Sequence, residues 1–483
     1  FRNHNRPVVP LDGAMKTKMK MLNTLTAVIF LGTFSGCCHL PERIELRAPS
    51  VLPNTTRQMK TAGFWISRIT DPDRVVLTTE EIDALNAHTQ DQAKLIEDIM
   101  LGTPIEGKEV VTDLTASLNA VRERALFLPS GEKAGEEFFG PIVQRMNLEA
   151  LPDQITLRYG VVVHGTDQRV LPTTEALYAE KGDVDFDELQ NSGLDVGTPV
   201  LILHQSQDGQ WIYGKTQFSA GWVQAQDVAE ADLDAVKRFS ARDQIVVVTV
   251  PKADIFLNKE RTKYDDYVRM GTVLPLTGVN GDLVEVVVPV RNLDGALVEV
   301  SGYLKADEVS IGFLPYTART MIKQAFKMLN TPYGWGDMYG EQDCSRFIQE
   351  IFSTVGILMP RNSSQQAQVG VLVSEFSDQD SADIRIAAFQ QAVSGVTTLY
   401  MKGHILLYLG SVEGRPFAIH ASWGYREKAE CPGPQNGQAC RPEVIRVMNR
   451  VVVSDLSLGE GSWKKSLLER LLSVRQVRGL KEK

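Results

Sequence analysis

The chain has 483 residues, of which 43% are apolar and 23% charged, as in globular proteins of about three to four domains. Its net charge of −9 at pH 7 argues against nucleic acid as a partner. The sequence contains no Gly-rich phosphate loop, no paired Cys-x-x-Cys ligands and no His-Glu-x-x-His motif. We therefore expect no cofactor and no metal.

Residues 1–48 predict an export signal and a linker. Lysines at positions 16, 18 and 20 precede an apolar stretch, residues 22–34, which is shorter than the about 20 residues that a bilayer needs and suits a signal peptide. Ser35 and Gly36 lead into Cys37, an order that resembles a lipoprotein signal, with plain secretion as the alternative. We expect an exported, periplasmic protein held at the membrane by a lipid on Cys37, with Met15 as the true start.

Residues 49–153 predict a mostly helical N-terminal domain. The segment opens with proline-rich sequence, and Thr78 and Glu81 then have the spacing of a capping box, which marks a helix start. We expect this domain to wrap around its neighbours.

The next two regions, residues 154–233 and 234–311, contain an internal repeat. Gly221-Trp-Val-Gln-Ala-Gln-Asp-Val228 and Gly302-Tyr-Leu-Lys-Ala-Asp-Glu-Val309 share one pattern, and each closes a run of short β-rich segments with turn signals. Both regions resemble bacterial SH3-like domains and predict two small β-barrels. Wall binding or spacing is their simplest function.

The last region, residues 312–483, carries a cysteine and two histidines in an order that suits nucleophilic catalysis. Cys344 opens a segment with the apolar spacing of a helix that has one buried face. In the first turn of such a helix, free N–H groups and the helix dipole favour a thiolate. His404 and His420 each lie in a β-favouring run, which predicts His404 as the base and His420 as the group that orients it.

These motifs together resemble the NlpC family of papain-like cell-wall peptidases. The resemblance covers roughly residues 313 to 450 and rests on four motifs: Tyr333-Gly-Trp-Gly, Asp343-Cys-Ser, Met359-Pro-Arg-Asn-Ser-Ser-Gln365 and Gly403-His-Ile-Leu-Leu-Tyr-Leu-Gly410. It implies an α+β fold for a multidomain chain. It also implies cleavage of the γ-D-glutamyl to diamino-acid bond of peptidoglycan stem peptides, with Cys344, His404 and His420 as the catalytic residues. The sequence departs from the family where Arg346 replaces a glycine and where Tyr400-Met-Lys-Gly403 replaces Pro-Gly-Asp before the histidine.

The resemblance also implies substrate-binding residues. Asp343 and Ser345 match residues that hold the free amine and backbone of an N-terminal L-Ala, and Tyr333 matches a tyrosine near the reacting carbonyl. A helix N-cap is the structural alternative for Asp343. For Arg361, a structural salt bridge is favoured over a clamp on a substrate carboxylate.

In related enzymes the first SH3-like domain closes the substrate pocket and contacts the terminal amine, and an N-terminal clip region precedes it. A desolvated ammonium needs a carboxylate or an aromatic face. The candidates in this chain are Asp187, Glu188, Tyr213 and Trp222. Their structural alternatives are turn acids and aromatic residues of the barrel core.

Cys431 and Cys440 bracket a turn-rich loop that could close a small disulfide in an oxidising compartment, with two free thiols as the alternative. The predicted function is a γ-D-glutamyl-L-diamino-acid endopeptidase for stem peptides with a free N-terminal L-Ala. The alternatives are an N-acetylmuramoyl-L-alanine amidase on the same fold and a non-catalytic wall-binding lipoprotein. The expected partners are stem peptides and the membrane. The sequence predicts no oligomeric state.

Overall fold

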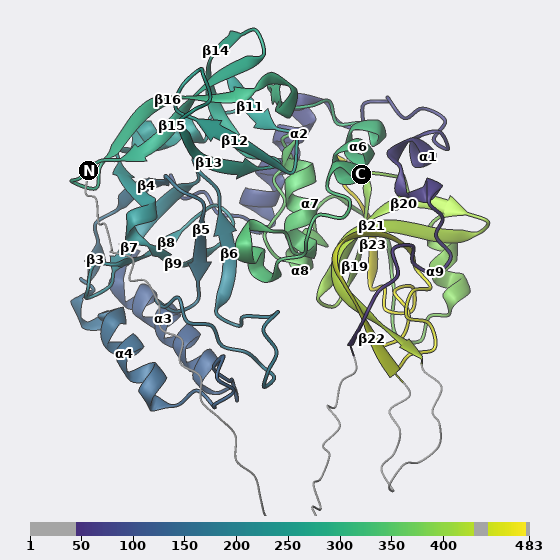
Figure 1. Cartoon of the computed structure of the whole chain (residues 1–483), viewed down its shortest axis with the longest axis horizontal. Helices are drawn as coiled ribbons and strands as arrows, with labels where there is room; N and C mark the ends of the chain where they lie inside the picture. The colour runs from purple at the N-terminus through teal and green to yellow at the C-terminus, as the bar shows by residue number, and fades with distance from the viewer. Residues whose placement is uncertain (1–44, 429–442, 480–483) are drawn as a thin grey trace, which may run out of the picture. The chain divides into compact units, whose positions relative to one another are not determined.

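The computed structural model describes residues 45–428 and 443–479 (Figure 1). In these ranges the chain is a mixed α/β protein with three seven-stranded sheets. No helix within them is long and apolar enough to cross a membrane. The expectations for the export signal, for Cys37 and for Cys431 and Cys440 concern residues outside these ranges.

The N-terminal region contributes helices to two different cores. The capping box predicted at Thr78 is confirmed, because its side chain accepts from the Glu81 N–H and the Glu81 side chain accepts from the Thr78 N–H. Trp65 packs against Phe417 of the C-terminal sheet, with ring centroids 5.4 Å apart. Figure 1 shows α3 and α4 beside the first sheet. The elements are η1 (Gln58–Lys60), α1 (Ala62–Ile66), α2 (Thr79–Ala87), η2 (His88–Gln92), β2 (Ile105–Glu106), α3 (Gly107–Arg122), α4 (Glu136–Met146), η3 (Leu148–Ala150) and β3 (Gln154–Ile155).

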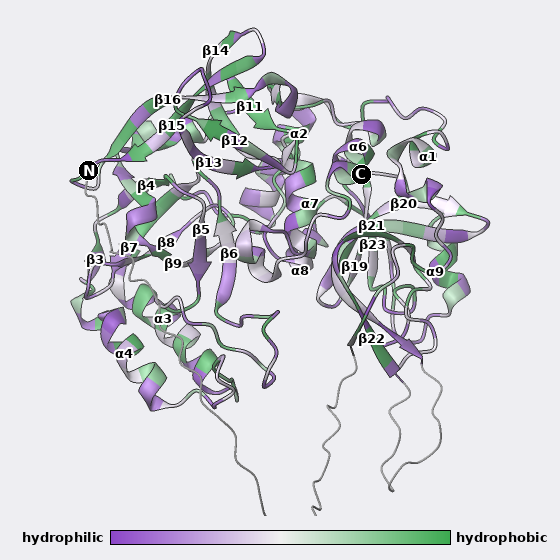
Figure 2. Ribbon diagram, in the orientation of Figure 1, coloured by the Kyte–Doolittle hydropathy of each residue, from purple (hydrophilic) through white to green (hydrophobic). Residues whose placement is uncertain are grey.

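The first sheet is antiparallel, in the order β10-β4-β7-β8-β9-β5-β6. Its inward side chains share one apolar core with α3 and α4, and Figure 2 shows these helices alternating between apolar and polar residues. The elements are β4 (Arg158–Val162), β5 (Thr166–Arg169), β6 (Gln190–Leu194), β7 (Pro199–Gln205), β8 (Trp211–Lys215), β9 (Ala220–Gln224), η4 (Ala225–Asp227), β10 (Val228–Ala231) and α5 (Leu233–Phe239).

The second sheet has the order β13-β12-β16-β15-β14-β11-β17. The two octapeptides of the internal repeat have the same local structure, a strand, a 3₁₀ turn and a second strand. The predicted barrels are present as antiparallel sheets, and no closed barrel is seen in the described residues. The elements are β11 (Ile245–Val248), β12 (Lys252–Phe256), β13 (Tyr264–Arg269), β14 (Val273–Asn280), β15 (Leu283–Arg291), β16 (Leu297–Lys305), η5 (Ala306–Glu308) and β17 (Val309–Ile311).

The C-terminal sheet has the order β1-β22-β21-β20-β19-β23-β18. Helix α7 packs its apolar face on β20 and β21, where Phe347, Ile348 and Ile351 are fully buried. This packing places the start of α7 next to the start of β20. The elements are β1 (Glu45–Arg47), α6 (Ala318–Lys327), η6 (Trp335–Gly340), α7 (Cys344–Ser353), α8 (Ser363–Gln366), β18 (Val371–Glu375), α9 (Ala382–Ala388), β19 (Thr397–Met401), β20 (His404–Val412), β21 (Arg415–Lys428), β22 (Glu443–Asp455) and β23 (Ser473–Gln476).

Candidate active site

Cys344 is the first residue of α7, as the sequence predicts. It is a free cysteine with 7% of its surface exposed. Burial, and then the Asp343 carboxylate, raise the pKa of the Cys344 thiol to about 12, although the Ile405 N–H, the Arg361 charge and the Ser345 N–H act in the opposite direction. The thiol is therefore neutral in the resting protein and needs a base that removes its proton.

His404 begins β20, directly before the Ile405 N–H that lies beside the Cys344 sulfur. Its Nε2 lies 2.8 Å from Nδ1 of His420, so Nδ1 of His404 is left for the thiol. Burial, and then the charge of Arg470, lower the pKa of His404 to about 3. The imidazole is therefore neutral at physiological pH and can accept a proton.

Ser454, on β22, extends this chain of hydrogen bonds and was not predicted. Its Oγ lies 2.9 Å from Nε2 of His420, and both residues are fully buried. If Ser454 accepts from His420 Nε2–H, Nδ1 of His420 accepts from Nε2–H of His404. This tautomer leaves an unprotonated Nδ1 on His404, as a general base requires. No local pattern in the sequence marks Ser454.

Tyr333 lies in the loop before α7, close to Cys344 and Asp343. Burial, and then electrostatic interaction with these two groups, raises the pKa of Tyr333 well above its usual value, so its hydroxyl keeps its proton and can donate it. The loop that follows has left-handed backbone at four positions, including Gly336 and Asp337. Strand β6 holds this part of the loop, because Gln190 Nε2 donates to the Gly336 carbonyl at 3.0 Å and the Gly193 N–H donates to Asp337 at 3.0 Å.

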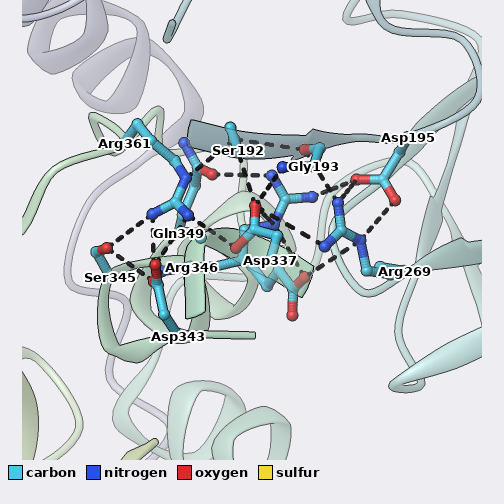
Figure 3. A network of polar contacts seen from close by, with 12 residues as sticks. Ser192, Gly193, Asp195, Arg269, Asp337, Asp343, Ser345, Arg346, Gln349 and Arg361 are labelled. Carbon is cyan, nitrogen blue, oxygen red and sulfur yellow. Dashed lines mark hydrogen bonds and ion pairs between the residues drawn. The ribbon is translucent and has the colours of Figure 1, made fainter. Parts of the chain in front are cut away.

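Arg361 binds both of the predicted amine-binding residues (Figure 3). Its guanidinium forms bidentate hydrogen bonds with the Asp343 carboxylate, at 2.8 and 3.2 Å, and also donates to the Ser345 hydroxyl at 2.9 Å. The remaining N–H groups donate to Asp337 at 2.9 Å and to Ser192 of β6 at 3.0 Å. Asp343 is also the N-cap of α7, because it accepts from the Arg346 N–H. Arg361 is thus a buried structural ion-pair residue, which was the favoured prediction.

Arg346, which stands where the family has glycine, belongs to a charge network that joins three regions of the chain (Figure 3). Its guanidinium pairs with Asp195, just after β6, and with Glu350 on α7 at 3.0 Å. Arg269 of the second sheet also pairs with Asp195, at 2.8 Å, and lies 3.8 Å from Glu350. The departure from the family motif therefore supplies a contact between the nucleophile helix and the region of the first sheet, and Arg269 of the second sheet reaches the same two carboxyl groups.

Asp187 binds an arginine of the first SH3-like region, and Glu188 binds an arginine of the N-terminal region. Asp187 is 2% exposed, pairs with Arg169 at 2.5 Å and accepts from two backbone N–H groups. Glu188 pairs with Arg124 at 2.8 Å. The link from Asp187 to the C-terminal region is through its backbone, whose carbonyl accepts from Nε1 of Trp335 at 3.1 Å.

Tyr213 and Trp222 lie in the core of the first sheet. Their ring centroids are 5.6 Å apart, and they are 8% and 0% exposed. A fully covered side chain has no surface with which to touch a ligand. The prediction that Trp222 contacts substrate is therefore corrected to a packing role, and Tyr213 packs with it in the core that the first sheet shares with α3 and α4.

A different segment of the first SH3-like region reaches the C-terminal region. The ring of Phe186 lies between those of Trp335 and Trp423, with centroids 5.3 and 5.2 Å away, and the Asp185 carboxylate accepts from Nε1 of Trp423 at 2.8 Å. The sequence analysis missed these residues because nothing in a local pattern pairs a loop phenylalanine with tryptophans about 150 and 240 residues later.

The charge network predicts a pH-dependent stability. It contains Arg269, Arg346 and Arg361 against Asp195, Asp337, Asp343 and Glu350, so one carboxyl group exceeds the guanidinium groups. Burial raises the pKa of Glu350 from 4.5 to about 7 despite the two nearby arginines, and its Oε2 has no hydrogen-bond partner.

Because Glu350 binds its proton more tightly in the folded state, the free energy of unfolding should fall as pH rises from about 4.5 to 7. The loss is up to about 3 kcal/mol for a shift of this size. Glu350→Gln should flatten this dependence and be the more stable protein at pH 8, measured by urea denaturation across pH. A parallel pH profile for Glu308→Gln, at a half-exposed pair with Lys305, controls for the other carboxyl groups. An unchanged slope in Glu350→Gln would contradict the assignment.

Comparisons with known proteins bear on two parts of the chain. A sequence model of the NlpC/P60 family matches residues 330–427, and one of an SH3 domain of the SH3b1 type matches residues 176–224. The γ-D-glutamyl-L-lysine dipeptidyl-peptidase of Bacillus subtilis (strain 168) is 29% identical over 107 residues. That match covers 22% of this chain and 34% of the relative, so the chain spans about a third of the relative's length.

One solved structure resembles nearly the whole chain. It is described as a novel NlpC/P60 endopeptidase from Photobacterium damselae subsp. piscicida, and it aligns with a TM-score of 0.71 over 90% of this chain and 99% of its own. At 20% identity this likeness shows a shared fold. The matched residues include Cys344, His404 and His420. The chain therefore carries an NlpC/P60 family domain, preceded by an SH3 domain of the SH3b1 type.

Proposed function

We propose that this protein is a peptidoglycan hydrolase, a cysteine peptidase that cleaves the γ-D-glutamyl to diamino-acid bond of stem peptides. The observation that carries the proposal is a buried thiol at a helix N-terminus, beside the Ile405 N–H that follows His404, a histidine whose Nε2 is fixed by His420 and, through it, by Ser454. The family of the matched domain and the name of the Bacillus relative support cell-wall peptides as the substrate class.

The proposed reaction passes through an acyl-enzyme. Nδ1 of His404 takes the thiol proton as the Cys344 sulfur attacks the γ-carbonyl carbon, and it returns that proton to the departing amine when the C–N bond breaks. A water molecule then attacks the thioester while His404 accepts its proton. The second step frees the γ-carboxylate and restores the thiol.

Two donors suit the negative charge that develops on the carbonyl oxygen. The Cys344 backbone N–H has no intrahelical partner, since it belongs to the first turn of α7. The Tyr333 hydroxyl lies near the thiol and keeps its proton. We assign these two groups to the oxyanion, where one such donor typically contributes about 10²–10³ in kcat.

The remaining assignments rest on the sequence. The internal repeat supports an SH3-like second domain at residues 234–311, after a first one at 154–233 and before a catalytic domain at 312–483. The clip-like helical region at 49–153 would then wrap the first SH3-like domain and the catalytic domain. Helix α1 packs in the core of the catalytic domain, and α3 packs in the core of the first sheet. Residues 1–48 support export and a lipid on Cys37, with the periplasm as the proposed location.

Mass spectrometry of the products tests the function. The purified protein should convert L-Ala-γ-D-Glu-diaminopimelate-D-Ala, free or still joined to muramic acid, into a fragment that ends in D-Glu and a dipeptide that begins with the diamino acid. A denatured sample serves as control. Release of an intact peptide headed by L-Ala from the muramic acid would contradict the endopeptidase and indicate an amidase. No cleavage of either substrate would favour a non-catalytic wall-binding role.

A further inference from the structure

A cavity of about 430 Å³ lies beside the polar face of α7, the face that does not pack on the C-terminal sheet. Its other walls come from the N-terminal region at 97–100, from the end of β6 and the turn after it at 192–199, and from the turn at 270–273 of the second sheet. Neither Cys344 nor His404 lines it. The volume is in the range of small-molecule pockets, about 300–1000 Å³. The cavity is therefore a candidate ligand site separate from the proposed catalytic residues.

The walls of this cavity combine apolar side chains with a few polar groups. Phe239, Phe313 and Met270 are among its lining residues, and Phe239 and Met270 are buried. The lining also includes the exposed Glu97 and, on α7, Glu350, which is 1% exposed. The cavity therefore extends from the protein surface to a buried carboxyl group. This combination of apolar walls and few polar groups is typical of ligand sites.

Two oxygen atoms of the lining residues are buried and have no hydrogen-bond partner among the residues that the structure describes. They are Oε2 of Glu350 and Oγ1 of Thr272. The other oxygen of Glu350 accepts from Nε of Arg346 at 3.0 Å. The turn that carries Thr272 lies directly against α7, because a Cβ on Gly271 would come within 2.7 Å of the Glu350 carbonyl oxygen. The two free oxygens thus belong to adjoining walls, and a ligand that donates to them would remove the cost of leaving them unpaired.

The three arginines that line the cavity are already paired within the chain. Arg346 forms two ion pairs, Arg361 donates with all five of its N–H groups to other side chains, and Arg242 pairs with an aspartate of α2 at 3.2 Å. Nη1 of Arg269 also has no hydrogen-bond partner, but it lies 3.9 Å from Asp337, and Arg269 does not line this cavity. Since the charge network holds one carboxyl group more than guanidinium groups, a cation fits this cavity better than an anion.

We propose that this cavity binds an aliphatic ammonium compound, whose ammonium group pairs with Glu350 and whose carbon chain contacts the apolar walls. Thr272 supplies a second acceptor. Such a ligand brings the positive charge that the network lacks. Aliphatic diamines and the free diamino acids of wall peptides share this chemistry. The proposal does not depend on the reaction proposed for Cys344, which does not line the cavity.

Binding of an ammonium group should displace a proton from Glu350. Burial raises the pKa of Glu350 to about 7, while Arg346 of the same helix and Arg269 of β13 act against this shift and Asp195, after β6, adds to it. About half of the Glu350 side chains are therefore protonated at pH 7, and only the ionised form pairs with an ammonium. An alkylammonium has a pKa near that of lysine, about 10.4, and keeps its charge. The affinity should therefore rise by up to roughly tenfold from pH 6 to pH 8.

Isothermal titration calorimetry of the whole protein with cadaverine, an aliphatic diamine, tests the proposal. We expect saturable binding at pH 8. Glu350→Gln should weaken it by at least about tenfold, the order expected when a charge-assisted hydrogen bond is lost. Glu308→Gln is the matched control, because Oε2 of Glu308 also has no hydrogen-bond partner but the residue does not line the cavity. This variant should bind cadaverine as the wild type does.

Two further ligands make the test specific. The diol in which hydroxyl groups replace the amines of cadaverine should bind at least about tenfold more weakly than cadaverine, because it brings no charge. Diaminopimelate carries the same ammonium group as a wall diamino acid does, so its affinity relative to cadaverine tells which of the two sources the cavity prefers.

Three results would overturn the proposal: no saturable binding of cadaverine or diaminopimelate, equal binding of cadaverine by the wild type and Glu350→Gln, or equal binding of cadaverine and the diol. The first would leave the cavity to water. If Glu350→Gln does not fold, the pH series on the wild-type protein still decides, because an affinity that does not change from pH 6 to pH 8 excludes pairing with Glu350. None of these results bears on the function proposed for Cys344.

Discussion

Replacing Cys344 with alanine should reduce the release of the diamino-acid dipeptide by at least about 10⁴-fold in kcat, the loss typical when a nucleophile is removed. The thiol is the free cysteine of the described residues, and it begins α7 against the start of β20. Quantitative mass spectrometry of the dipeptide, with the wild-type protein at matched concentration, gives the measurement.

Ser353→Ala, at the other end of the same helix, is the matched control. Its Oγ donates to the Gln349 carbonyl within α7 and takes no part in the site. This variant should keep wild-type activity within about twofold, because surface or helix-end substitutions of this kind shift stability little. If Cys344→Ala retained full activity while folded like the wild type, the cysteine mechanism would be wrong.

The catalytic residues could be predicted because each has a strong local signal. Cys344 stands at the start of an amphipathic segment, and His404 and His420 stand in β-favouring runs. Ser454 has no such signal. It meets His420 because β21 and β22 pair with Ala418 opposite Ser454, a register that depends on the whole sheet.

The partners of charged residues were harder to predict than the residues themselves. The unusual Arg346 was visible in the sequence, but its partner Asp195 lies 151 residues earlier. The same holds for Arg361, which meets Ser192 at a separation of 169 residues. Charge alone does not select among the 60 Asp and Glu residues of the chain, so only the packed structure identifies these pairs.

The errors in the first SH3-like region have a related cause. Tyr213 and Trp222 follow the alternation of strands β8 and β9, and the sequence does not reveal which face is covered by α3 and α4. The covered face is the one that carries these aromatic side chains. The contacts with the C-terminal region come instead from Asp185 and Phe186, in the loop before β6.

Arg269→Met should destabilise the protein by about 3–5 kcal/mol, the usual loss when one partner of a buried ion pair is removed. Arg269 is 3% exposed and donates to Asp195 and to the Gly193 carbonyl, so its loss leaves the four buried carboxyl groups of the network with two guanidinium groups. Lys259→Met is the matched control, at a half-exposed lysine 4.0 Å from Glu285, and should change the free energy of unfolding by less than about 1 kcal/mol. Urea denaturation at pH 7 compares the three proteins.

A double variant separates the loss of the ion pairs from a loss of packing. If the effect of Arg269→Met arises from unmatched charge, Glu350→Gln should recover part of the lost free energy of unfolding. The second change removes one of the carboxyl groups that then exceed the guanidinium groups. The two changes should then differ from additivity by about 1–3 kcal/mol, as expected for residues of one network. Strict additivity would mean that Arg269 acts through packing alone. A positive coupling would establish that the second sheet holds the nucleophile helix through its charge, since Glu350 lies on α7 and Arg269 ends β13.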